Sequence, residues 1–278
     1  MFTKARIAVF IDGCFWHGCP EHGRRVFRHN VKYWPAKIAA NVAGAALTVA
    51  CAVAAAPIAT ASRDPQNDTI SCPAGELDNC YKFEQMREFV EIGEQMVISY
   101  LNQIGVSGRS LPTLAYIPSA ISVSSPCVDQ NGNGTQHDRS YDYCPTDNTV
   151  YIGQNSLWDF YQQYGAASPI SGLAHEYGHY LQAFTHVPDP TTPTETIRHE
   201  NQADCVSGAF INYLDDRGVV EYPKDFDNVG QFLTATASAE APGRNHGTAE
   251  ERTQSFELGY TGALPACNQF YPATPLTP

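Results

Sequence analysis

Apolar side chains recur at helical spacing in several stretches of the chain after residue 78. Between 79 and 104 they fall at about every third or fourth position, and Gly105 follows, so a packing helix is predicted there. Ser168 can cap another helix, Pro169 can occupy its first turn, and this helix is expected to run to Phe184. Further helices are predicted at 153–165, 194–216, 225–239 and, from a capping box, 248–259.

Two short runs rich in β-branched and aromatic residues predict strands at 113–117 and 149–152. They lie between the first helical stretch and the later ones. The predicted fold class is therefore α+β, mainly helical with a small β-sheet.

The loop between these strands carries a candidate ion site. Its D-x-N-x-N-G order is that of the start of a calcium-binding loop, with Asp129, Asn131 and Asn133 as the candidate ligands. Ser140 stands where the twelfth-position acid of such a loop is expected. A turn-rich loop without calcium is the alternative interpretation.

Charge divides the chain near residue 61. Residues 1–61 carry seven Lys or Arg and two Asp or Glu, which leaves 10 basic and 27 acidic residues, a net charge of −17, for 62–278. An acidic surface repels phosphate, so the charge argues against nucleic acid as a partner of the main domain. At 278 residues and 43% apolar composition, the chain can bury a substantial core.

An export signal is predicted at 43–61. Lys32 and Lys37 precede an uncharged, alanine-rich run, and A-x-A spacing places a cleavage site after Ala61. A retained membrane anchor is the second interpretation of this segment. The six cysteines after it suit three disulfides in an oxidising compartment, and reduced buried thiols are the alternative. They are Cys72, Cys80, Cys127, Cys144, Cys205 and Cys267.

Residues 1–42 differ in character from the rest. Their GCFWHGC run resembles the very-short-patch-repair mismatch endonucleases, which implies zinc ligation by Cys14, His17 and Cys19. The family's nuclease chemistry uses an upstream segment that this chain does not contain. The segment is therefore interpreted as a gene-fusion remnant or the product of a mis-assigned start, and a free-standing zinc knuckle is the alternative.

The motif His175-Glu176-Tyr177-Gly178-His179 carries the candidate chemistry. On a helix, His175 and His179 share one face and can bind one metal ion, while Glu176 lies beside the same point. Imidazole nitrogens suit zinc, and a glutamate next to a zinc-bound water can take its proton. The pattern is short enough to arise by accident, so further ligands decide its meaning.

The predicted helix at 194–216 offers those ligands. Glu200 can supply the third bond to the ion, and Asp204, one turn later, can accept a hydrogen bond from the outer nitrogen of a ligand histidine. Two solvated acids on a helix face are the alternative interpretation of this pair.

Three stretches together, HEYGHYLQ, RHENQADCVSGAF and HGTAEERTQSFELGY, resemble the bacterial neutral zinc metallopeptidase family over about 78–270. The resemblance implies a zincin-like fold in which His175, His179 and Glu200 bind zinc and Glu176 is the general base. It also implies particular cysteine pairs. These are Cys127 with Cys144, Cys205 with Cys267 and, by subtraction, Cys72 with Cys80.

His246 lies in the HGT part of the third stretch. In related zinc peptidases a late histidine stabilises the oxyanion of the tetrahedral intermediate, and a structural role in the loop is an equal alternative. Four other residues near these motifs are interpreted as structural: Tyr177, His186, His199 and Arg252.

The expected protein is an exported zinc metallopeptidase that acts on peptides or proteins. Its segments are an endonuclease-like remnant (1–42), a signal or anchor (43–61), a linker (62–77) and a peptidase domain (78–278). The strand at 149–152 is expected at the edge of the sheet, where it could bind substrate backbone. The rival functions are a non-catalytic exported binding or scaffold protein with a structural metal and, from residues 1–42, a DNA mismatch endonuclease.

Overall fold

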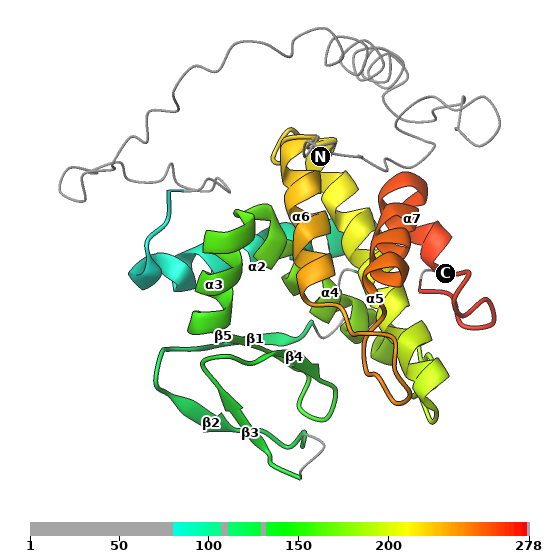
Figure 1. The fold of residues 1–278 in the computed structure, drawn as a ribbon, viewed down its shortest axis with the longest axis horizontal. Coiled ribbons are helices and arrows are strands. Elements are labelled where there is room, and N and C mark those ends of the chain that lie inside the picture. Colours follow the sequence, from blue (N-terminus) through cyan, green and yellow to red (C-terminus); the bar gives the residue numbers. More distant parts are fainter. Residues whose placement is uncertain (1–79, 107–110, 129–131, 277–278) are drawn as a thin grey trace, which may run out of the picture. The chain divides into compact units, whose positions relative to one another are not determined.

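Helices make up most of the chain that the computed structural model describes, which is residues 80–106, 111–128 and 132–276. All strands of these described ranges lie between two helices, α2 and α3, so the segments rich in strand and in helix are separate along the sequence (Figure 1). The elements in chain order are η1 (Phe83–Gln85), α2 (Met86–Gln103), β1 (Thr113–Ile117), β2 (Ser122–Ser124), β3 (Thr135–His137), β4 (Tyr141–Cys144), β5 (Thr149–Gly153), α3 (Gln154–Tyr164), α4 (Ala167–Phe184), α5 (Pro193–Asp215), α6 (Lys224–Ala235) and α7 (Ala249–Cys267). The mainly helical α+β class with a small sheet is confirmed.

A three-stranded sheet has the order β1-β5-β4, with β1 parallel and β4 antiparallel to β5. β5 is buried along its whole length, as expected of an apolar strand paired on both sides. The prediction that 149–152 forms a sheet edge is therefore wrong, because β4 covers that side. β4 is the edge strand that contacts α4.

β2 and β3 form a separate antiparallel pair. This pair and β4 replace the loop without regular structure that was expected between the two predicted strands. The disulfide predicted to join Cys127 and Cys144 is present and closes this region. The calcium proposal lies largely outside the described residues, which omit Asp129 and Asn131, and Asn133 is exposed.

α4 is the central helix and is buried along most of its length. It packs against α2, α3, α5 and α6 as well as β4. The predicted cap is wrong, because the helix begins before Ser168, whose hydroxyl instead donates to the Tyr164 carbonyl at 2.8 Å. A buried helix surrounded by neighbours derives its stability from packing more than from its cap.

α5 and α7 form the most extensive helix–helix contact of the described chain. A Cβ on Gly259 would collide with the carbonyl oxygen of Cys205, so the two backbones approach closely here. Gly259 is thus a contact point inside α7 and not its end as predicted. The regular helix runs past it to a kink at Ala263 (φ 53°, ψ −171°), and a second short helical segment ends at Cys267. The predicted capping box between Thr248 and Glu251 is confirmed.

The disulfide predicted between Cys205 and Cys267 is present and joins α5 to the end of α7. The predicted pairing of Cys72 with Cys80 lies outside the described residues, because Cys72 is not among them. Disulfides form and persist in oxidising compartments, so these two pairs suit the oxidising environment that the cysteine count predicted. Among the described helices, none combines the length and apolarity needed to cross a bilayer.

Candidate metal centre

His175 and His179 lie one turn apart on α4 and point their Nε2 atoms at the same place. The two Nε2 atoms are 3.1 Å apart, and the rings meet edge to face with centroids 4.8 Å apart. Two nitrogens at this separation, each with a lone pair available when the ring is neutral, can bind one ion between them.

Glu200 reaches the same point from α5. Its Oε2 lies 3.3 Å from His175 Nε2, and its Oε1 lies 3.5 Å from His179 Nε2. The ligand atoms of His175, His179 and Glu200 all lie within 4.8 Å of one another. The structure therefore brings together the three residues that the sequence predicted as ligands.

These residues fit a metal ion in a further respect. Oε2 of Glu200 is buried and makes no hydrogen bond within the described part of the protein, although imidazole nitrogen lies close by. Burial alone would raise the pKa of Glu200, but the neighbouring His179 and His175 lower it to about 2, so the group is a carboxylate. A buried carboxylate oxygen without a donor, beside two imidazole nitrogens, suits a divalent ion.

The outer nitrogens of both histidines have partners that orient the rings. Nδ1 of His175 lies 2.9 Å from Oδ1 of Asp204, and Nδ1 of His179 lies 2.7 Å from Oε1 of Gln182. When each Nδ1 carries the proton and donates it to oxygen, each Nε2 is left with its lone pair directed at the ion. Asp204 thus lies where the sequence placed it, and the contribution of Gln182 was not predicted.

Arg252 on α7 fixes Asp204 in turn. The sequence indicated a structural residue here but gave it no part in the centre. Asp204 is fully buried, and the Arg252 guanidinium donates through Nε to Oδ2 and through Nη2 to Oδ1, both at 2.9 Å. Burial alone would raise the pKa of Asp204, but Arg252 and His175 hold it well below its usual range. The capping box of Thr248 and Glu251, just before Arg252, could have indicated part of this role, because it predicts that Arg252 lies in the first turn of a well-formed helix.

Glu176 lies next to His175 on α4, and a backbone group of the sheet holds it. The N–H of Tyr143, on the edge strand β4, donates to Oε2 of Glu176 at 2.9 Å. Burial raises the pKa of Glu176 to about 8 in the metal-free protein. Since any residue except proline supplies a backbone N–H, no side-chain pattern could have predicted this contact.

His246 also reaches the centre, from the loop before α7. Its Nε2 lies 3.4 Å from Oε2 of Glu200, and its side chain is 39% exposed, against 8% for His175. Burial lowers the pKa of His246, which favours the neutral ring. His246 is not one of the closely clustered ligands among the described residues, so it can interact with a group bound beside them.

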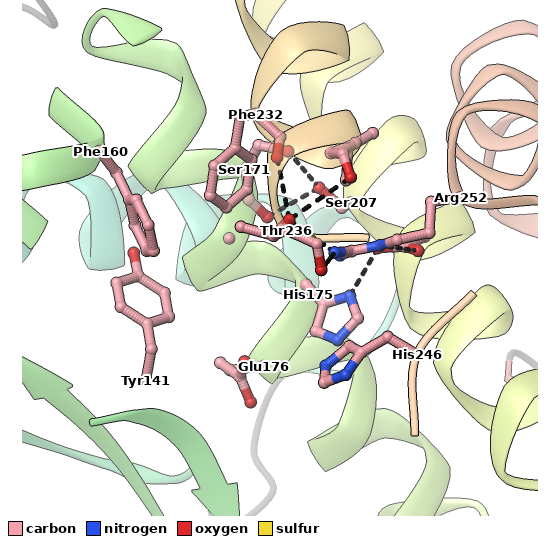
Figure 2. Close-up of a pocket in the computed structure, with 13 residues that line it drawn as sticks. Tyr141, Phe160, Ser171, His175, Glu176, Ser207, Phe232, Thr236, His246 and Arg252 are labelled. Carbon is pink, nitrogen blue, oxygen red and sulfur yellow. Dashed lines mark hydrogen bonds and ion pairs between the residues drawn. The ribbon is translucent and has the colours of Figure 1, made fainter. Parts of the chain in front are cut away.

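A cavity of about 200 Å³ opens beside these side chains. Figure 2 shows Glu176, His175 and His246 together, with Tyr141, Phe160 and Phe232 across from Arg252. The candidate base and two histidines therefore border a space that a small molecule or a side chain can enter.

Comparison with known proteins finds relatives that match only parts of the chain. The chain is 27% identical over 159 residues to the uncharacterized protein YpfJ of Escherichia coli K12, covering 46% of this chain and 53% of that protein. It is 28% identical over 158 residues to the uncharacterized protein Rv2575 of Mycobacterium tuberculosis H37Rv, and this match covers 46% of this chain and 54% of that protein. The chain thus spans about half the length of these relatives.

A shorter match is of a different kind. The chain is 55% identical over 42 residues to the type II nicking enzyme V.NaeI of Lentzea aerocolonigenes, which is 15% of this chain and 25% of that enzyme. No family model and no solved structure matches the chain. The function of the centre therefore has to be argued from its geometry.

Proposed function

We propose that the protein is an exported zinc metallopeptidase with a zincin-like fold, related to the bacterial neutral zinc metallopeptidases. The observation that carries the proposal is the convergence of His175, His179 and Glu200 beside a cavity that Glu176 also lines. Two imidazoles and one carboxylate with room for a water are a common ligand set of catalytic zinc.

Bound zinc would supply the Lewis acidity that makes a water nucleophilic near neutral pH. Tyr143 holds Oε2 of Glu176, which leaves Oε1 to accept a proton from the attacking water. The same carboxyl then returns this proton to the amine that leaves. A fixed backbone donor keeps the carboxylate in one orientation through both transfers.

Two other groups act on the substrate in this proposal. Nε2 of His246, which lines the cavity, donates a hydrogen bond to the oxygen that becomes negatively charged when the carbonyl is attacked. The substrate backbone adds along β4, the edge strand, in place of the 149–152 strand of the original expectation. A neutral His246 can donate from Nε2 only in the tautomer that carries its proton there.

A structural metal in a non-catalytic protein is the second candidate, and the position of His246 is the observation that favours it. A small movement could make its Nε2 a fourth protein ligand, and four protein ligands are typical of a closed structural zinc site. The two candidates differ in their predictions for Glu176, which a structural site does not need.

The test uses the full chain and a Glu176→Gln variant. Zinc per chain is measured by mass spectrometry, and hydrolysis is measured with casein and a peptide library. We expect equal zinc in both and a loss of hydrolysis of about 100-fold or more in the variant, the usual contribution of a general base. Glu88→Gln, the same change at an exposed position on α2, is the matched control.

Full zinc binding with equal hydrolysis by wild type and Glu176→Gln would contradict the peptidase proposal. Full zinc binding without any hydrolysis would favour the structural metal. A nuclease function receives little support, because the match to the nicking enzyme covers 15% of the chain and the remainder is acidic.

A further inference from the structure

The cavity beside Glu176 has an aromatic wall that the proposed chemistry does not use. Tyr141 from β4, Phe160 from α3 and Phe232 from α6 meet edge to face, with centroid separations of 5.6 Å and 4.9 Å along the series. All three line the cavity, and Figure 2 shows them on one side of it. Edge-to-face rings present an apolar surface that suits another ring or an aliphatic group.

Gly172 keeps this wall open. It lies one turn before Glu176 on the same face of α4, so the apolar space begins one helical turn from the candidate base. A Cβ at Gly172 would lie 3.1 Å from Cε1 of Tyr141 and 3.4 Å from Cζ of Phe232. Any larger residue here would therefore project between the two rings and reduce the space.

The opposite end of the cavity offers no free cation. Arg252 is the only Lys or Arg in the described lining, and its guanidinium donates to Asp204 and to the Thr236 carbonyl and hydroxyl. The hydroxyls of Ser171 and Ser207 lie 2.7 Å apart and bond to each other. An acidic side chain entering the cavity would lose its hydration without meeting an unpaired Lys or Arg of the described lining. The lining carboxylates already have partners, Asp204 in Arg252 and Glu176 in the Tyr143 N–H, so a lysine would have to compete for them.

From this arrangement we infer that the cavity takes an apolar side chain, preferably aromatic, of a residue next to the bond that is cleaved. The inference rests on the proposed peptidase function and names its substrate class. A cavity of about 150 Å³ lined by apolar side chains can hold benzene, so about 200 Å³ accommodates a phenyl group.

The first test measures binding without turnover. Blocked peptides of the form Ala-Ala-X-Ala-Ala, with X as Phe, Leu, Ala, Asp or Lys, are titrated by calorimetry into the zinc-loaded full chain carrying Glu176→Gln. We expect the Phe and Leu peptides to bind about tenfold or more tightly than the other three, since a pocket discriminates by roughly this factor through one or two methylenes. Equal affinities, or no binding of the Phe peptide, would overturn the inference.

The second test changes the pocket itself. In the same background, Gly172→Ala should lower the ratio of Phe to Ala affinity by about tenfold or more, because the new methyl group occupies the space between the rings. Gly230→Ala on α6 is the matched control, since a Cβ there meets nothing within 4 Å. If Gly172→Ala does not fold, Phe160→Ala removes a half-buried part of the wall and should also lower the ratio. An unchanged ratio in the folded pocket variant would overturn the inference.

Hydrolysis of the same peptides by the wild-type chain separates this inference from the proposed function. Cleavage at the same rate whatever X is would support the peptidase and overturn the assignment of the pocket. Selective binding of the Phe peptide, abolished by Gly172→Ala but never followed by cleavage, would support the pocket and contradict the peptidase.

Discussion

Replacing Arg252 by methionine should destabilise the protein strongly, because among the described residues it would leave the buried Asp204 carboxylate with His175 as its one remaining partner. Asp204 is fully buried and Arg252 is 5% exposed, so solvent cannot replace the two lost hydrogen bonds. Methionine keeps much of the length and helix propensity of arginine. Breaking one partner of a buried pair lowers the free energy of unfolding by about 3–5 kcal/mol.

For a domain of this size, each kcal/mol lowers Tm by about 2–4 °C, so a fall of roughly 6–20 °C is expected. Urea unfolding of the zinc-loaded wild type, Arg252→Met, Asp204→Asn and the double variant gives the coupling between the two residues. We expect the double variant to lose about 2 kcal/mol less than the sum of the single changes, because it contains no unpaired buried charge. The zinc affinity of Arg252→Met should also fall about 10- to 100-fold, since Asp204 orients His175.

Arg139→Met is the matched control. Arg139 pairs with Asp159 at 2.8 Å, but its side chain is 59% exposed, so the same substitution there should change stability by less than about 1 kcal/mol. A loss in Arg252→Met no larger than in this control, with additive effects in the double variant, would refute the buried-pair argument.

Three further predictions concern the ligands and the disulfide. Glu200→Ala should abolish stoichiometric zinc binding, measured by mass spectrometry after dialysis, and full retention of zinc would contradict its role as a ligand. In the metal-free protein, burial by itself would lower the pKa of His175, but Asp204 and Glu200 raise it to about 10. The stabilisation that this pKa shift gives the folded protein is complete below the pKa of His175 in the unfolded chain, about 6.5, and is lost as pH rises through about 10. Urea titrations of metal-free protein should therefore show stability falling between about pH 7 and 10, and a flat profile would refute the assignment. Replacing Cys205 and Cys267 together by serine opens a loop with a sequence separation of 62 residues, so unfolding in urea should require up to about 4 kcal/mol less. A change in the free energy of unfolding of less than about 1 kcal/mol would show that packing holds α5 and α7 together without the disulfide.

Much of the helical part could be predicted from sequence, because its signals are local. Periodic apolar positions predicted α2, and the capping box at Thr248 predicted the start of α7. The predictions failed where packing overrides a local signal. Gly259 has the conformational freedom that often ends a helix, yet it lies inside α7. Its lack of a side chain there allows the close approach of the Cys205 backbone, which belongs to a distant segment of the chain.

The sheet was harder to predict for a related reason. β4 is only four residues long, and its Tyr-Asp-Tyr alternation lies inside a stretch dominated by turn residues. The alternation of Tyr141 and Tyr143 about Asp142 is the period-two signal that could have identified it. Which strand forms the edge depends on pairing between strands, and a single strand's pattern does not record its partners.

The candidate site shows the same division. Spacing on a helix predicted that His175 and His179 would share a face, and the structure brings Glu200 to them from α5. Arg252 and the backbone of Tyr143 were missed, because each acts through a contact between elements distant in sequence. Charge on a helix and an N–H in a strand are too common to indicate a role by themselves.

The contact between Tyr143 and Glu176 means that separate parts of the fold orient the candidate ligands and the candidate base. The three ligands and the residues that orient them come from α4, α5 and α7, whereas the base takes its orientation from the sheet. In a peptidase of the proposed kind, a change in β4 that moved this N–H but kept the pairing with β5 would leave the candidate ligands in place and allow the base to rotate. For the proposed peptidase, loss of activity with retention of the metal would therefore require a change at only one contact, between one short strand and α4.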